Sequence, residues 1–496
     1  MNILRKKTGP FFIIASIAFI FLTLIIQYLQ YNLALDKNFS QSFFNSDAVF
    51  FINMADSLKT GKSILSDWIL TGAPRIFPTL ILNLIIITFS ENYFTAQIII
   101  GMMQFFLFNI LMILLLKFYT NLKFSLLSIL IIDLFLFFSI SIEPFSYLLI
   151  SSHHFGNYLN FLLSCLLFFG KENNNWFYNI FKWSIIFISS FSNPIFLATF
   201  TLPYTLSSMI FEKINFLRLT LKNLFLILIS ILGYILGDVL FLHTDCLKCY
   251  DNTYQEMTKI NFDGIYISLY HIKEFFFSHS NFLQNFFFVL SISIPIFYVI
   301  YKIRTYGFSN IFNNKKAYFF SFIILSILTN IFCFLFLTIN PQFRHIYVIY
   351  FSSLFLVPII AYKYIIHDVT KNYFNLSISS FVITTFLLFF NIDTSKKVNF
   401  SFYPDDIKFI DQVLNKYNVS HGFVSYDNGN RLLFLSRLSL SMIHYHKVKP
   451  IHLWINKKWI EKEPEFILNL NPNDFIFNNY QTLSKDHITI HILKSS

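Results

Sequence analysis

The chain has 496 residues, of which 55% are hydrophobic and only 13% are charged, and its net charge is +11. One water-soluble core cannot bury so much apolar surface, so the composition excludes an ordinary soluble protein and predicts an α-helical polytopic membrane protein. The basic residues lie in short segments between apolar runs. We therefore explain the positive charge by membrane topology and expect a lipid bilayer, not nucleic acid, as the partner.

The apolar runs predict about eleven membrane spans. The first, residues 11–30, is too long for a signal-peptide core and lacks a small-residue cleavage site, so we interpret it as an uncleaved helix. Arg5, Lys6 and Lys7 precede it and place the N-terminus inside. The later spans are expected at residues 96–116, 124–142, 159–170, 180–190, 194–210, 224–242, 282–300, 319–337, 346–365 and 376–390. An odd number of spans puts the C-terminus outside.

A shorter apolar run covers residues 77–89 and is too short to cross at about 20 residues per helix. We expect a helix packed at the outer interface, because a span here would move the later basic loops to the outside. The predicted transmembrane domain is therefore residues 1–390, with a first outer loop over residues 31–95. The sequence Ser192-Asn193-Pro194 predicts an outer turn, because Pro cannot continue a helix.

The composition changes from about residue 391, where charged residues become frequent. Alternating strand-like runs cover residues 422–426, 438–444 and 486–493, and helix-like runs cover residues 404–417 and 430–436. Roughly a hundred residues are enough for a small domain. We expect residues 391–496 to form an α/β domain on the extracytoplasmic side that rests on the outer loops.

The stretch 45–78 follows the first span and concentrates charge in a chain that has little; it contains Asp47, Asp56, Asp67, Trp68 and Arg75. Glycosyl transfer from a lipid-phosphate sugar needs a carboxylate to deprotonate the acceptor and cationic or polar groups to hold the departing phosphate. Asp47 is the candidate base. Its alternative role is to cap the helical run AVFFINMADSL that follows it. Asp56, on the same helix, is expected to be solvated.

Other outer residues are candidates for substrate binding. Asp67 and Trp68 could bind sugar through a carboxylate and a stacking ring, although Trp is also an interfacial anchor. Arg75, Arg344 and His345 are outer cations that suit phosphate recognition, or a lipid headgroup contact or structural ion pair. His153 and His154 could hold phosphate or donate a proton, and polar packing is the alternative. Because adjacent histidines point in different directions on a helix, we expect no metal chelate there.

Two further features lie on the outer side. Cys246 and Cys249 stand in an exported loop, where oxidation is permitted, and are candidates for a local disulfide. Asp238 is an acid within an apolar span, which indicates either a functional role or a hydrogen-bonded structural one. No cofactor is assigned, and participation of a divalent metal stays open.

Several of these elements together resemble the GT-C-fold integral membrane glycosyltransferases, which include the protein O-mannosyltransferases and the lipid A aminoarabinose transferases. The matching residues are Ser46-Asp47-Ala48, the segment 55–61, Trp68 and Phe77-Pro78, with Arg344-His345 before a late span. The tail 424–436 resembles exported tails of uncharacterised bacterial members. The chain has a single Asp where the family commonly has an Asp-Glu pair, and Ala73-Pro74-Arg75 replaces the family's Lys-Pro-Pro run.

The resemblance implies a bacterial inner-membrane enzyme that transfers a sugar from a polyprenyl-phosphate donor on the outer face, with Asp47 at the position of the family's catalytic acid. The acceptor would be a glycan, a lipid or a protein. Two other classes stay open. A transporter for lipid-linked sugars would place its polar groups within paired spans near the midplane, often in two similar halves. A non-catalytic scaffold would bind partners through the exported tail.

Overall fold

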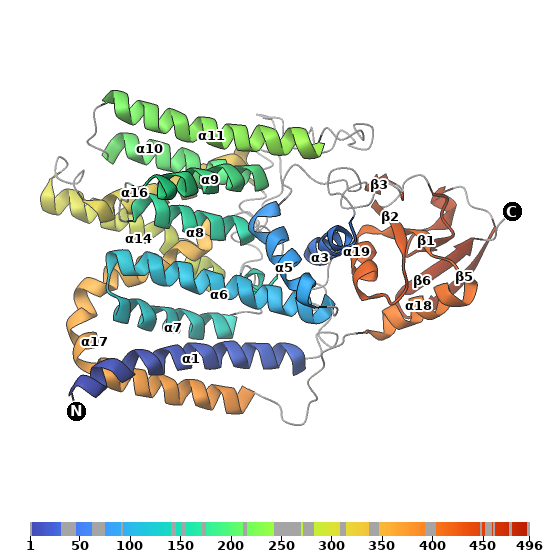
Figure 1. Ribbon diagram of the computed structural model, residues 1–496, viewed down its shortest axis with the longest axis horizontal. Coiled ribbons are helices and arrows are strands. Elements are labelled where there is room, and N and C mark those ends of the chain that lie inside the picture. The colour runs from blue at the N-terminus through green and yellow to red at the C-terminus, as the bar shows by residue number, and fades with distance from the viewer. Residues whose placement is uncertain are drawn as a thin grey trace.

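The computed structural model describes residues 2–30, 46–61, 75–90, 93–139, 145–150, 155–170, 175–211, 216–242, 269–270, 282–307, 314–336, 347–391, 403–446, 449–451, 459, 462–475 and 479–493. A bundle of helices and a smaller sheet domain lie side by side along the long axis (Figure 1). The N-terminus and the sheet domain are at opposite ends of the bundle.

The bundle is built from long apolar helices. Its members are α1 (Asn2–Gln30), α6 (Tyr93–Tyr119), α7 (Leu122–Ser139), α8 (Phe155–Phe169), α9 (Trp176–Ser192), α10 (Leu202–Phe211), α11 (Phe216–Leu242), α14 (Phe282–Tyr306), α16 (Lys315–Phe336) and α17 (Tyr347–Asn391). By length and composition, eight helical segments in the described residues are sufficient to cross a membrane. Two of the eight lie within α17, whose ribbon turns near its middle (Figure 1).

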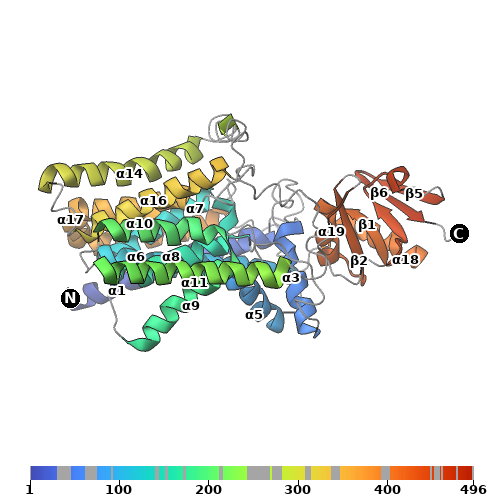
Figure 2. The same cartoon turned by 90° about the horizontal axis from the view of Figure 1, so that it is seen from above.

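Three of the predicted spans correspond to shorter helices. These are α8, α9 and the pair η3 (Leu197–Thr201) and α10. The turn predicted at Ser192-Asn193-Pro194 is present: α9 ends at Ser192, and the Asn193 side chain accepts a hydrogen bond from the Ile195 amide at 3.1 Å. The helix predicted over residues 77–89 is also present, as η1 (Ile76–Leu80) followed by α5 (Ile81–Phe89). This segment lies at the end of the bundle nearest the sheet domain (Figures 1 and 2).

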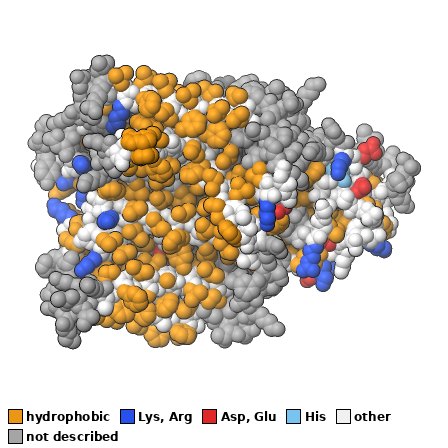
Figure 3. Space-filling view, in the orientation of Figure 1, with side chains coloured by type: hydrophobic (Ala, Val, Ile, Leu, Met, Phe, Trp, Pro, Cys, Tyr) orange, Lys and Arg blue, Asp and Glu red, His pale blue; other side chains and the backbone are white. Residues whose placement is uncertain are grey.

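The outer surface of the bundle is apolar. In Figure 3 an orange belt of hydrophobic side chains covers its middle, and Lys and Arg side chains gather at the end away from the sheet domain. On α6 the exposed residues Phe106, Ile110, Leu114 and Phe118 recur every fourth position and so form one stripe. Exposed apolar stripes of this kind suit contact with lipid tails, which supports a membrane setting.

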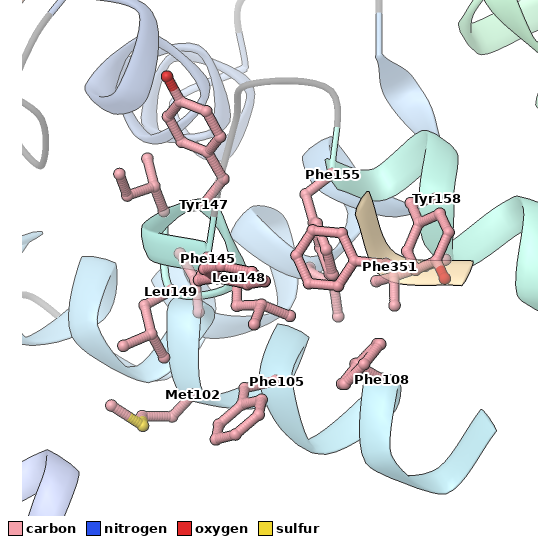
Figure 4. Packing of buried hydrophobic residues seen from close by; sticks show 14 of the residues in the cluster. Met102, Phe105, Phe108, Phe145, Tyr147, Leu148, Leu149, Phe155, Tyr158 and Phe351 are labelled. Atoms are coloured by element: carbon pink, nitrogen blue, oxygen red, sulfur yellow. The ribbon is translucent and has the colours of Figure 1, made fainter. Parts of the chain in front are cut away.

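Aromatic side chains fill the centre of the bundle (Figure 4). Phe108 of α6, Phe155 of α8 and Phe351 of α17 meet there with ring centroids about 6 Å apart, the usual spacing of aromatic pairs. The turn η2 (Phe145–Leu148) closes one side. Its carbonyls are held by Gln104, whose side-chain amide lies 3.0 and 3.1 Å from the oxygens of Tyr147 and Leu148. One buried amide thus satisfies polar backbone groups that lipid would leave unpaired.

Helices α9 and α11 approach closely because α11 presents two glycines. A Cβ at Gly233 would lie 2.5 Å from the Phe187 carbonyl oxygen, and one at Gly237 would lie 2.6 Å from that of Phe191. Small residues four apart are a common way to pack membrane helices. We expect Gly233→Leu to lower stability by about 1–3 kcal/mol, because backbone atoms cannot move aside.

Thermal unfolding of the purified chain in detergent checks this expectation. Leu232→Ala is the matched control, since the neighbouring Leu232 side chain is 57% exposed. A midpoint for Gly233→Leu that equals the wild-type value would contradict close packing at this contact.

The sheet domain is α/β, as the tail predicted. Helices α18 (Asp405–Tyr417) and α19 (Tyr426–Leu435) accompany a six-stranded sheet of order β3-β2-β1-β4-β6-β5. Strand β1 (His421–Ser425) pairs in parallel with β2 (Ser441–His446) and β4 (Phe466–Leu468), and the remaining pairs are antiparallel. The other strands are β3 (Lys449–Ile451), β5 (Tyr480–Lys485) and β6 (Ile488–Leu493).

The predicted strands at 422–426, 438–444 and 486–493 correspond to β1, β2 and β6. The second starts later than expected, at Ser441, and α19 starts earlier than its predicted residue 430. Strands β3, β4 and β5 were not predicted. The first two have three residues each, and β5 is a largely exposed edge strand with polar side chains on both faces, so periodicity gives little signal for any of them.

A buried histidine packs against α19. His444 of β2 is fully buried, and a Cβ on Gly429 of α19 would lie 2.2 Å from its Nε2. Burial lowers the pKa of His444 to about 4, because the cation would lose its hydration. In the unfolded chain His444 takes up a proton near pH 6.5, whereas in the folded domain it stays neutral down to about pH 4. The domain is therefore most stable with respect to this group above pH 6.5, and its stability falls as the pH drops toward 4.

We expect this histidine to cost the domain about 3 kcal/mol of stability at pH 4 relative to pH 7. The loss is measured by chemical denaturation of the full chain in detergent at several pH values, with hydrogen exchange of the β1 and β2 amides as the readout of the sheet domain. His444→Phe should flatten the profile between pH 6.5 and 4. An unchanged slope in that variant would assign the acid sensitivity to other groups.

Candidate functional site

The candidate site is centred on η1, at the end of the bundle that adjoins the sheet domain. Arg75 directly precedes η1 and has a left-handed backbone (φ 51°). Its amide donates a hydrogen bond to the Ser192 carbonyl at 2.9 Å, and the Phe77 amide donates to the Ser192 hydroxyl at 3.0 Å. From α8, the Asn160 side chain donates to the Phe77 carbonyl at 3.2 Å. The end of α9 and a side chain of α8 therefore hold the backbone on which Arg75 stands.

The same segment packs closely on α8. A Cβ at Gly156 would lie 2.7 Å from the Thr79 hydroxyl and 2.9 Å from Cδ of Pro78, so only glycine allows this approach. Asn83, one turn further along, donates from its amide to the Thr79 carbonyl at 2.8 Å. These contacts with α8 and α9 tie η1, and with it the backbone of Arg75, to helices of the bundle.

Polar side chains are concentrated on the helices that pack against η1. Asn83 of α5, Asn157 of α8, and Ser189 and Ser190 of α9 are all buried. Within the described part of the chain, the Oδ1 atoms of both asparagines and the Oγ atoms of both serines have no hydrogen-bond partner. Buried polar atoms are normally satisfied by protein, water or ligand. This composition therefore suits a hydrated site or one that takes a polar ligand.

Arg75 itself is half-buried beside these groups. Its planar guanidinium can offer paired N–H donors to an anionic oxygen pair, and a partly water-excluded setting strengthens such contacts. Binding of an anionic phosphate is also the role that the sequence predicted for Arg75.

Asp47 is the second residue of α3 (Ser46–Lys59), so it stands in the first turn of the helical run predicted for this stretch. Its side chain lies outside the described residues. The helix packs against η1, α5, α6 and α19, which brings the element carrying Asp47 next to the one carrying Arg75. Helix α3 is largely enclosed by these neighbours, and four consecutive residues, Val49, Phe50, Phe51 and Ile52, are fully buried.

The structure corrects one expectation for this helix. Asp56 is not a solvated residue; it is half-buried, and the Tyr93 hydroxyl at the start of α6 lies at hydrogen-bonding distance from its carboxylate. Lys59, at the last turn of α3, donates from Nζ to the Ile87 carbonyl of α5 at 3.2 Å. Sequence reasoning missed both contacts, since neither partner is close in the chain.

Most of the other predicted site residues lie outside the described residues. They are Asp67, Trp68, His153, His154, Cys246, Cys249, Arg344 and His345. The backbone of Asp238 belongs to α11, but its side chain is not described. In the chain order, the two histidines immediately precede α8, and Arg344-His345 stands just before α17.

A second buried polar pair was not predicted. Asp133 of α7 is fully buried, and the Asn109 amide of α6 donates to its two carboxylate oxygens at 3.0 and 2.9 Å. The signal was available, because Asp133 is an acid within a predicted span, the same criterion that singled out Asp238. Among the described elements, helix α7 is not one of those that make extensive contact with η1, so we treat this pair separately from the candidate site.

In the described ranges, no group of three or more His, Cys, Asp and Glu side chains could hold a metal ion. The sequence was also compared with known proteins. It matches no protein-family model, and no curated protein sequence matches it significantly.

Proposed function

We propose that the chain is an inverting membrane glycosyltransferase. It would move a sugar from a polyprenyl-phosphate-linked donor to an extracytoplasmic glycan, lipid or protein acceptor at a bacterial inner membrane. The observation that carries the proposal is the half-buried Arg75 among buried polar side chains, on a segment packed beside the helix that begins with Ser46-Asp47. Their position, opposite the Lys and Arg side chains gathered at the other end of the bundle, supports an outer-face site (Figure 3).

In the proposed reaction, the Asp47 carboxylate removes the proton from an acceptor hydroxyl or amine as that atom attacks the anomeric carbon of the sugar. The new glycosidic bond forms on the face opposite the breaking bond to the phosphate oxygen, so the configuration inverts. The electron pair of the broken bond leaves with the lipid phosphate. Arg75 stabilises the charge that develops there, and Arg344 and His153 are the further candidates for holding the phosphate.

The test is glycan profiling of envelope lipids, polysaccharides and proteins from cells that carry the wild-type chain, a deletion, or Asp47→Asn at matched expression. Asp405→Asn, an exposed substitution on α18, is the matched control. We expect one sugar to disappear in the deletion, to stay absent with Asp47→Asn, and to return with the control. Because the general-base contribution is typically 10²–10⁴-fold, the loss should be nearly complete.

A wild-type profile in the Asp47→Asn cells would instead assign Asp47 a capping or packing role. The chain would then be better explained as an assembly scaffold or as a transporter of lipid-linked sugars. The chemical class of the missing sugar conjugate identifies the acceptor in the expected case.

A further inference from the structure

Helix α3 lies between the bundle and the sheet domain (Figures 1 and 2). On one side it packs against α5, η1 and α6, and on the other against α19. The contact with α19 is the most extensive that α3 makes. The membrane domain therefore covers only part of the helix that carries Asp47, and α19 of the sheet domain packs against another part.

The three parts meet at Tyr93, the first residue of α6. Its ring stacks on Phe434 of α19, with centroids 6.1 Å apart and an interplanar angle of 30°. Its hydroxyl faces the carboxylate of Asp56 on α3. Phe434 is 5% exposed, and Leu432, two residues before it, is fully buried, so this side of α19 is shielded from water. One tyrosine thus connects α3, the bundle and the sheet domain.

The length of α3 makes this contact important. It has 14 residues, and isolated helices of about 12–15 residues are marginal in water. Packing must supply most of its order. The Lys59 contact to the Ile87 carbonyl fixes its C-terminal end, whereas Asp47 stands at the other end.

We propose that the sheet domain is a positioning element of the site, in which α19 holds α3 in place through Phe434 and Tyr93 and so sets the location of Asp47. Both aromatic residues are positioning residues. The consequence for sugar transfer rests on the function proposed above, but the effect on the order of α3 does not.

Hydrogen exchange of the full chain in lipid nanodiscs tests the proposal. We expect Phe434→Ala to raise the exchange rate of α3 amides by about tenfold, the scale of one lost aromatic pair. Amides of β1 and β2 should keep their protection. Leu483→Ala is the matched control: it truncates a partly buried residue on β5, in the same domain but away from α3. It should leave α3 unchanged.

Tyr93→Ala removes the same stacking contact from the bundle side. It therefore tests the effect of that contact on α3 even if Phe434→Ala unfolds the sheet domain. Unchanged α3 exchange in Tyr93→Ala, with the sheet protected, overturns the proposal. Transfer measured on the same samples separates the two ideas. If the wild-type chain transfers no sugar, the enzymatic function is wrong, but the effect of the two substitutions on α3 still holds. If Tyr93→Ala disorders α3 and the chain stays active, the sheet domain does not position a catalytic residue.

Discussion

Replacing Arg75 with asparagine is expected to reduce sugar transfer by at least about 100-fold while leaving the chain folded. Loss of one donor to a developing negative charge costs about 10²–10³ in rate, and here the donor is a full cation. Asparagine is chosen because it tolerates the left-handed backbone found at this position, so the contact of the Arg75 amide with Ser192 is retained. Transfer of labelled sugar in isolated membranes measures the effect.

The comparison with Arg75→Lys separates charge from shape. Lysine keeps the positive charge but lacks the planar pair of donors, so transfer should fall to an intermediate value. Arg304→Ala is the control, since Arg304 is an exposed cation at the far end of α14. Full activity in Arg75→Asn would exclude Arg75 from phosphate binding and leave it a structural role at the end of α9.

Asn109→Leu is expected to lower the stability of the bundle by about 3 kcal/mol. The substitution leaves the fully buried Asp133 without the two hydrogen bonds that Asn109 donates. Replacing both residues with leucine should restore most of the loss, because an apolar pair of similar size carries no unsatisfied group. Unfolding of the four variants in detergent provides a double-mutant cycle.

The control for that cycle is Ile131→Ala on α7, the helix of Asp133, where the side chain is 60% exposed on the apolar surface. It should change stability far less. Additive losses in the double variant would show that Asn109 and Asp133 do not stabilise each other, and would direct attention to Asp133 as a functional acid.

Element type was predictable wherever the hydrophobic pattern is long and regular. The apolar runs of α6, α7 and α16 are each long enough to define a helix without reference to the rest of the chain. The strand-like runs at β1 and β6 likewise predicted strands, and most residues of both strands are buried. Short or exposed elements such as β4 and β5 carry no such pattern. The two spans predicted at residues 346–365 and 376–390 both belong to α17, and the sequence did not predict that the helix continues from one to the other.

The sequence by itself determined that the chain is a helical membrane protein with a small α/β tail, because burial of apolar surface depends on composition and periodicity. It also marked Arg75 and Asp47 as unusual charges. Only the tertiary structure decided that α3 is enclosed by α19, that Tyr93 lies between Asp56 and Phe434, and that Asn109 pairs with Asp133. These contacts join residues from different elements, and their energies depend on distance and burial, which no local pattern encodes.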